Sequence, residues 1–217
     1  MRLRIRFAKQ GALRYTGHLD LHKIWERTAR RAGLPLAYSQ GFHPQPKIYL
    51  ASALPLGFSS RCELLDMRLK HEIPLEGLQE RIQDAVPSGL QIIAVEQVDD
   101  TLPALQTQLT AAEYEVVFVD PIDAAWLRGR VAELLGAETL PRERRGKPYD
   151  LRPLLEELEL TPAADRADEG RLVLKMRLTA REGATGRPEE VLEQLGLPLE
   201  SARVERSRLI FAESTVK

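Results

Sequence analysis

The chain begins with the segment RLRIRFAK, from Arg2 to Lys9, in which Arg alternates with Leu, Ile and Phe. A period of two residues places apolar side chains on one face and charged ones on the other, so this segment predicts a half-buried β-strand. The segment from His18 to Gly33 has apolar residues at three- and four-residue spacing, which predicts an amphipathic helix. The chain is therefore expected to start with a β-α unit.

The rest of the first half predicts three further extended regions and a second helix. The strands are expected at 35–39 with 47–53, at 61–70 and at 89–98, and the helix from Pro74 to Val86. The helix is indicated by Pro at its first position and Pro87 after its last. The resulting order, β-α-β-β-α-β, is that of ferredoxin-like domains, in which an antiparallel sheet carries two helices on one face.

The second half predicts a similar order. The strands are expected at 112–120, 171–181 and 202–212, the helices at 122–135 and 188–195, and extended segments around a turn at 138–160. We therefore predict an α+β protein of two tandem ferredoxin-like (βαββαβ) domains. The basic N-terminal domain spans residues 1–98, the linker 99–111, and the acidic C-terminal domain 112–217.

Composition and charge restrict the class of function. Residues 1–50 contain ten Lys and Arg but only Asp20 and Glu26, a net charge of +8 in a chain whose total is −1. Such a basic segment favours a polyanionic ligand. The single cysteine, Cys62, excludes an intramolecular disulfide and any Cys-only metal or iron–sulfur cluster. Neither a signal peptide nor a membrane-spanning stretch is indicated, so we expect a cytoplasmic protein without a membrane partner.

The helix at 18–33 is predicted to carry a cationic face. Lys23, Arg27, Arg30 and Arg31 fall opposite its apolar arc, and Arg14 lies close in sequence. Arginine forks suit phosphate oxygens, so the face is a candidate RNA contact. The alternative is the solvated outer face of an ordinary surface helix.

The loop from Tyr38 to Lys47, with the sequence YSQGFHPQPK, is the second candidate. Phe42 and Tyr38 offer rings for stacking beside His43 and Lys47, as single-stranded RNA binding requires. In the alternative interpretation Phe42 fills the core and the prolines fix the turn. The predicted nucleic-acid-binding residues are Arg14, Tyr15, Lys23, Arg27, Arg30, Arg31, Tyr38, Gln40, Phe42, His43 and Lys47.

The histidines give a weaker signal. His18 and His22 are one helical turn apart, but no third metal ligand is close in sequence, so we expect no metal and no cofactor. A capping or core role is expected for His18 and a surface role for His22. Alternatively, His18 and His43 are the acid–base pair of a metal-independent endoribonuclease. The basic cluster at 142–147 predicts either a further RNA contact or a hairpin tip, and the sequence does not decide between them.

These motifs resemble the signature of a bacterial radical-SAM-linked (radical-SAM-associated) protein family of unknown function. The resemblance is dense over residues 2–66, where it rests on Lys9-Gln10-Gly11, Arg14-Tyr15, Gly17-His18-Leu19-Asp20, the segment from Ala37 to Pro44, and Ala53-Leu54-Pro55-Leu56-Gly57. Tyr149-Asp150-Leu151-Arg152-Pro153 and Arg187-Pro188 are similar to its C-terminal landmarks. Members occur alone or joined to a radical SAM protein with a cobalamin-type domain, which implies such a protein as partner.

Together these features favour a binding protein over an enzyme. The expected function is to bind RNA, tRNA or rRNA, and to present it to a separate radical SAM enzyme. Two alternatives remain open at this point: the endoribonuclease with His18 and His43, and a protein-interaction module whose basic half docks an acidic partner.

Overall fold

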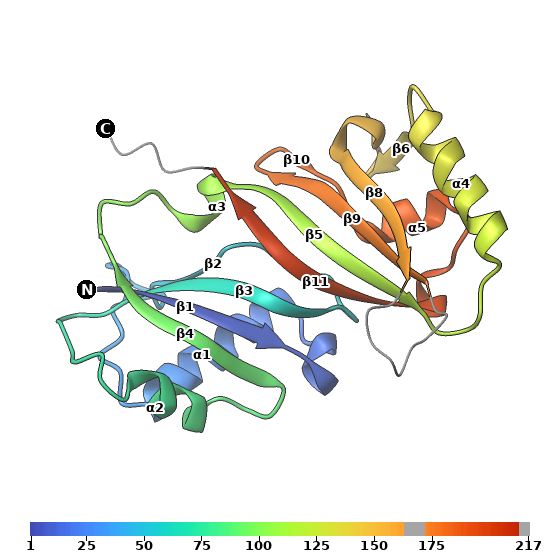
Figure 1. Ribbon diagram of the computed structural model, residues 1–217. Helices are drawn as coiled ribbons and strands as arrows, with labels where there is room; N and C mark the ends of the chain where they lie inside the picture. The colour runs from blue at the N-terminus through green and yellow to red at the C-terminus, as the bar shows by residue number, and fades with distance from the viewer. Residues whose placement is uncertain (163–171, 213–217) are drawn as a thin grey trace. The chain divides into compact units, whose positions relative to one another are not determined.

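The structure is a computed structural model that describes residues 1–162 and 172–212 (Figure 1). The chain divides into two compact units, Met1–Leu109 and Thr110–Lys217, which we call the first and second unit. The protein is of the mixed α+β class, with antiparallel strand pairing and few helices. Among the described residues, no helix is both long and apolar enough to cross a membrane.

The first unit contains four strands, whose sheet carries the two longest helices of the unit on one face (Figure 1). Its elements are β1 (Arg2–Lys9), η1 (Gly11–Tyr15), α1 (His18–Arg31), β2 (Ile48–Leu50), β3 (Ser59–Arg68), α2 (Leu78–Ala85), β4 (Leu90–Val98) and α3 (Leu105–Gln108). The strands lie in the order β2-β3-β1-β4, and each neighbouring pair is antiparallel. The β-α-β-β-α-β order predicted for the first half is therefore observed.

The core of the first unit lies between this sheet and its two helices. Leu3, Ile5 and Phe7 alternate along β1 and are fully buried, as the period-two pattern predicted. The ring of Phe7 packs edge-on against Trp25 of α1, with 4.8 Å between the ring centroids. Large aromatic pairs of this kind bury much apolar area, so they fix α1 against the sheet.

Two predicted elements of the first unit differ in the structure. The second helix begins at Leu78 rather than Pro74, because Gly77 at its N-cap adopts a left-handed conformation with φ +65°. Residues 35–39 form no strand but only the isolated bridges Leu36↔Leu69 and Tyr38↔Pro46. The loop that follows them is therefore anchored at its base by single contacts and not by a ladder.

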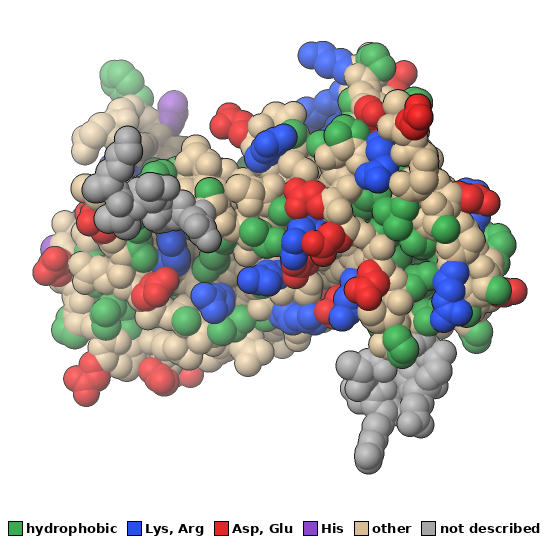
Figure 2. All heavy atoms as spheres, turned by 45° about the horizontal axis from the view of Figure 1, so that its top comes forward, with side chains coloured by type: hydrophobic (Ala, Val, Ile, Leu, Met, Phe, Trp, Pro, Cys, Tyr) green, Lys and Arg blue, Asp and Glu red, His purple; other side chains and the backbone are tan. Residues whose placement is uncertain are grey.

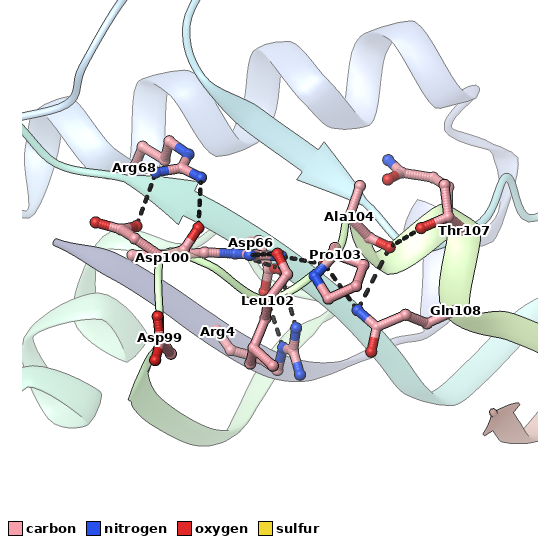
Figure 3. A network of polar contacts seen from close by, with 12 residues as sticks. Arg4, Asp66, Arg68, Asp99, Asp100, Leu102, Pro103, Ala104, Thr107 and Gln108 are labelled. Carbon is pink, nitrogen blue, oxygen red and sulfur yellow. Dashed lines mark hydrogen bonds and ion pairs between the residues drawn. The ribbon is translucent and has the colours of Figure 1, made fainter. Parts of the chain in front are cut away.

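The segment predicted as a linker, 99–111, is instead largely part of the first unit (Figure 3). The boundary between the units falls after Leu109, and Leu105 of α3 is buried. Arg2 of β1 donates from Nη1 to the carbonyl of Leu102 at 2.6 Å and from Nη2 to that of Pro103 at 2.9 Å. These bonds join the chain's first strand to residues about a hundred positions later, which periodicity could not indicate.

The second unit has the element order β5 (Leu109–Phe118), α4 (Ala124–Gly136), β6 (Pro141–Arg144), β7 (Lys147–Asp150), η2 (Arg152–Leu154), β8 (Leu155–Pro162), β9 (Leu172–Arg181), β10 (Ala184–Thr185), α5 (Pro188–Gln194), η4 (Leu199–Ser201) and β11 (Ala202–Phe211). In its sheet β9 lies between β8 and β5, and β11 follows β5. Asp123 caps α4 by accepting from the amides of Ala125 and Trp126.

The region 138–160 of the second unit contains more secondary-structure elements than the sequence predicted. A separate hairpin, β6–β7, stands between α4 and β8, and its turn contains Arg145 with φ +53° and Gly146 with φ +74°. Positive φ at both central residues is the conformation of a tight two-residue hairpin turn. The predicted strand 171–181 is observed from Leu172 onward, and Arg171 lies outside the described residues.

Candidate nucleic-acid interface

The outer face of α1 is exposed and carries the predicted cations. Lys23, Arg27, Arg30 and Arg31 are all exposed, whereas Leu21 and Trp25 on the opposite face are buried. The hydrophobic periodicity of the helix therefore predicted both faces. Arg30 and Arg31 lie in its last turn, where they are favourable neighbours for the negative end of the helix dipole.

Two of these four cations have anionic partners on the same helix. Lys23 Nζ is 3.3 Å from Asp20 Oδ1, and Arg30 Nη2 is 3.2 Å from Glu26 Oε1. Exposed pairs at this spacing are weak and open to competition by another anion. Arg27 and Arg31 have no ion-pair or hydrogen-bond partner among the residues that the structure describes. They are the cations most available to phosphate.

Part of the basic charge counted in residues 1–50 has a structural role. Arg2 and Arg4 both bind the buried carboxylate of Asp66, with Arg2 Nη2 at 2.5 Å from Oδ2 and Arg4 Nε at 2.9 Å from Oδ1. Lys9 is buried and donates to the carbonyl of Thr16 at 2.9 Å. The net charge of +8 therefore overstates what a ligand can contact.

The sign of the surface charge also gives little guidance on the face drawn in Figure 2. Lys and Arg side chains are interspersed there with Asp and Glu side chains. Charge alone therefore marks no binding surface on that face, and the candidate interface depends on α1 and its neighbouring loop.

The loop from Tyr38 to Lys47 is held at its base by backbone hydrogen bonds. The amide of Ser39 donates to the carbonyl of Gln45 at 2.8 Å, and the amide of Gln45 donates to Ser39 Oγ at 2.9 Å. Lys47 N donates to the carbonyl of Ala37 at 2.9 Å. Gly41, with φ +124°, turns the chain at the tip. The loop is thus an ordered projection.

Phe42 lies at the tip of this loop with its ring in solvent. Its exposed fraction is 101 %, and Gln40 and His43 beside it are also exposed. The alternative in which Phe42 fills the core is therefore wrong. Hydrophobic burial cannot explain this phenylalanine, since the ring contributes no core contact. Lys47, at the base of the loop, is half-buried and less accessible than predicted.

The loop and α1 are joined by two contacts that the sequence did not indicate. Tyr38 Oη donates to Glu26 Oε1 at 3.2 Å, and a ring nitrogen of His22, Nε2, lies 3.1 Å from the carbonyl oxygen of Ile48. Glu26 and His22 are one turn apart on α1, so the contacts hold both ends of the loop to the same helix. The base of the loop is consequently joined to the helix that carries the cations.

Arg14 and Tyr15 form a pair of their own on η1. The Arg14 guanidinium lies 4.8 Å from the centroid of the Tyr15 ring, and Arg14 Nη2 donates to Tyr15 Oη at 2.8 Å. The Tyr15 ring remains 64 % exposed. One face of this ring is thus covered by a cation, which leaves the other face for a ligand.

Sequence reasoning missed two exposed leucines of the first unit. Leu19 and Leu56 are 76 % and 61 % exposed. The exposure of Leu19 could have been predicted, because this residue falls on the polar arc of the helix. The exposure of Leu56 depends on the conformation of its loop, which the sequence does not indicate.

The histidines lie differently from the prediction. His18, expected to cap or pack, is exposed at the first turn of α1, and His22, expected on the surface, is half-buried against β2. Partial desolvation and the neighbouring His22 lower the pKa of His18, which Glu63 partly opposes. No group of three or more His, Cys, Asp or Glu side chains suited to a metal ion occurs in the described part of the chain. The structure shows no hydrogen bond between His18 and His43 among those described residues.

By its architecture this is a mixed α+β protein, and its surface carries a cationic helix face and an exposed aromatic loop. The chain belongs to the family described as an uncharacterized protein conserved in bacteria (DUF2344), which it matches over residues 2–188. This agrees with the bacterial family of unknown function expected from the motifs. No protein of curated function matches the chain.

Among solved structures, the chain is similar to one in a structure titled "Crystal Structure of a Cbf5-Nop10-Gar1 Complex", with a TM-score of 0.51 and 12 % identity. A second similar chain occurs in "Crystal structure of the archaeal box H/ACA sRNP Nop10-Cbf5 complex", with a TM-score of 0.47 and 11 % identity. Each alignment covers 98 % of this chain, which spans about half of the other, 50 % and 49 % respectively. At this identity the first likeness describes the fold alone.

Proposed function

We propose that this protein binds RNA through the outer face of α1 and the loop from Tyr38 to Lys47. The observation that carries the proposal is the fully exposed ring of Phe42 at the tip of an ordered loop. A solvent-exposed aromatic ring offers a face on which an unpaired base can stack. Beside Phe42 stands His43, and α1 supplies Arg27 and Arg31, which lack partners among the described residues.

The chemistry of single-stranded RNA fits this arrangement. Bases stack on aromatic rings without strong sequence preference, while guanidinium and ammonium groups hold the phosphates between them. The exposed ring supplies a stacking platform and the helix supplies the cations. Since Tyr38 and His22 tie the loop to α1, the platform and the cations keep a fixed relation within the first unit. Preorganisation of this kind lowers the entropic cost of binding.

The proposal extends to the architecture and to the partner. The strand orders β4-β1-β3-β2 and β11-β5-β9-β8 support two tandem ferredoxin-like units. The resemblance to radical-SAM-linked proteins supports a role in presenting tRNA or rRNA to a separate radical SAM protein with a cobalamin-type domain. With Cys62 as its one cysteine, the chain cannot supply three cysteine ligands to an iron–sulfur cluster.

The binding step is tested with labelled single-stranded RNA and purified Phe42→Ala protein. Because stacking contributes roughly 1 to 3 kcal/mol per base, the variant should bind about five-fold more weakly or worse, with an unchanged melting temperature. Phe42→Tyr keeps the ring and should bind like the wild type. Leu75→Ala, which removes another exposed apolar side chain of the first unit, is the matched control and should change neither quantity. Equal affinities for the wild type and Phe42→Ala would refute the stacking site.

The same assay separates the alternatives. Retention of intact RNA supports the binding function, whereas cleavage that is lost in His18→Ala or His43→Ala would favour the endoribonuclease. Failure to bind RNA, together with capture of an acidic protein, would favour the protein-interaction module. Presentation to the partner is tested by co-purifying the tagged chain with the radical SAM protein, with and without added RNA. The proposal expects a complex that RNA strengthens.

A further inference from the structure

The second unit contains a cleft that the proposed RNA surface does not use. It has a volume of about 320 Å³ and lies where the β6–β7 hairpin meets β10. Its lining residues are Arg144, Lys147, Pro148, Tyr149, Asp150, Leu154, Gly183, Ala184 and Thr185. Small-molecule sites begin at about 300 Å³, so the cleft is large enough for a group of nucleotide size and too small for a folded partner.

One wall of the cleft is fixed by a dense set of contacts around Arg144. Its Nη1 and Nη2 atoms each donate to the carbonyl of Thr185 at 3.1 Å, and Nη2 lies 2.6 Å from Glu190 Oε2. The guanidinium carbon is 4.7 Å from the centroid of the Tyr149 ring. Arg142, on the same strand, pairs with Glu193 of α5. The hairpin is therefore attached to α5 and β10, and the cleft exists before any ligand enters.

These contacts also decide which charges remain for a ligand. Arg144 and Glu190 neutralise one another, and Asp150 Oδ1 accepts from the amides of Leu140 and Arg152 at 2.7 and 2.9 Å. Lys147 lines the cleft, is exposed, and has no partner among the residues that the structure describes. Arg145 is likewise exposed in the adjoining turn. Asp150 keeps its negative charge, and the cations without a partner among the described residues are Lys147 and Arg145.

The rest of the lining includes apolar groups. Pro148 and Leu154 contribute aliphatic surface, and Ala184 contributes a methyl group. Apolar groups and an ammonium in one cleft suit a nucleobase joined to a phosphate, because burying the base removes apolar surface from water and the phosphate pairs with the ammonium.

We infer that this cleft binds one unpaired nucleotide of an RNA strand, with the base between Pro148, Leu154 and Ala184 and the phosphate at Lys147. The inference deepens the proposed RNA-binding function and rests on it for the identity of the natural ligand. The residues of the basic cluster at 142–147 then have two different roles. Arg142 and Arg144 hold the hairpin that forms the cleft, whereas Lys147 and Arg145 supply positive charge for the ligand.

The experiment titrates the full chain with uridine 5′-monophosphate, adenosine 5′-monophosphate and, separately, inorganic phosphate, observed through backbone amide signals by NMR. We expect saturable shifts of the amides at 147, 149 and 183–185 with both nucleotides and a weaker response to phosphate alone. Lys147→Gln should reduce nucleotide affinity about five-fold, as expected for one solvent-exposed ion pair. Lys175→Gln, which removes an exposed lysine of β9 outside this cleft, is the matched control and should retain affinity.

Ala184→Leu provides a second variant, because it fills the cleft without changing charge. Loss of nucleotide shifts in this variant at an unchanged melting temperature would support the site. Shifts that are absent in the wild type, or that survive both variants, would overturn it, as would saturation by an extended peptide but not by nucleotides.

The two proposals fail in distinguishable ways. If RNA affinity depends on Phe42 but nucleotides do not shift the amide signals of the cleft, only the cleft proposal is refuted. Nucleotide binding at the cleft with RNA affinity indifferent to Phe42 refutes only the surface on α1 and its loop.

Discussion

The phenol of Tyr38 donates a hydrogen bond to Glu26 Oε1 at 3.2 Å, and the same oxygen accepts from Arg30 Nη2, also at 3.2 Å. One carboxylate of α1 therefore positions both the start of the exposed loop and a cation of the helix face. Glu26 had been counted only as one of two acids that reduce the basic charge, yet its structural role is to connect the two parts of the candidate interface.

Tyr38→Phe removes this hydrogen bond and keeps the ring. The loss should cost about 0.5 to 1.5 kcal/mol and loosen the loop relative to α1. Amide hydrogen exchange at residues 39–45 should accelerate, and RNA affinity should fall less than in Phe42→Ala. Tyr49→Phe is the matched control, since Tyr49 is exposed and its hydroxyl has no partner among the described residues. Exchange in the loop that is identical for the two variants would show that Glu26 does not hold it.

Replacing Arg27 and Arg31 together by Gln should flatten the dependence of RNA affinity on salt. A single-stranded site loses about 0.7 log units of affinity per log unit of salt for each phosphate neutralised, so the slope should decrease by roughly one to two. Both arginines are exposed, so the melting temperature should hold. The matched variant replaces Arg81 and Arg128, exposed arginines of α2 and α4, and changes net charge equally. If both double variants change the slope alike, the effect is one of total charge and α1 is not the contact.

Asp66→Asn should destabilise the first unit strongly. The carboxylate is 1 % exposed and is shared by Arg2 and Arg4, so its neutralisation leaves two cations poorly compensated. Breaking such a buried pair costs about 3 to 5 kcal/mol, measurable as a shift of the urea midpoint. Asp100→Asn, in a half-exposed pair with Arg68, should cost under about 1 kcal/mol. Because Arg2 also holds Leu102 and Pro103, limited proteolysis should cut 99–108 faster in Asp66→Asn than in Asp100→Asn.

Local periodicity predicted the elements well where burial is one-sided. The alternation of Leu3, Ile5 and Phe7 and the apolar arc of α1 each have a repeat that a sequence displays directly. The pairing of Arg2 with Asp66 has no such repeat, because the two residues are 64 positions apart and meet only when β1 and β3 pair. For the same reason Arg2 was included in the basic charge of residues 1–50, and 99–111 was predicted to be a linker.

The candidate site shows the same limit. Residue types in the loop from Tyr38 to Lys47 indicated a stacking surface, but the same types suited a core plug. Which interpretation holds depends on how the loop is anchored. Its anchors are the hydrogen bonds from Tyr38 to Glu26 and from Ser39 to Gln45. The first contact joins two side chains and the second joins two backbone groups, and neither has a sequence repeat. Exposure of Phe42 could therefore be proposed from the sequence but not established.

Glu189 at the start of α5 should lower the free energy of unfolding of the second unit in a pH-dependent way. Burial raises the pKa of its carboxyl above the usual 4.5, and Oε2 is buried without a hydrogen-bond partner among the described residues. The folded state then holds the proton more tightly than the unfolded chain does. Stability is consequently full below the unfolded pKa and falls as the pH rises through the higher folded pKa.

Glu189→Gln imitates the protonated carboxyl, so the variant should match the wild type at pH below about 4 and exceed it at pH 7. The gain should stay under about 1 kcal/mol, because the side chain is partly exposed and solvent screens its charge. Glu200→Gln, at an exposed glutamate of the same unit, is the matched control and should show no such pH dependence. Urea unfolding of the three proteins at pH 4, 5.5 and 7 measures the difference. If the gain in the free energy of unfolding is equal at all three pH values, Gln improves packing at this position and protonation of Glu189 does not cause the gain.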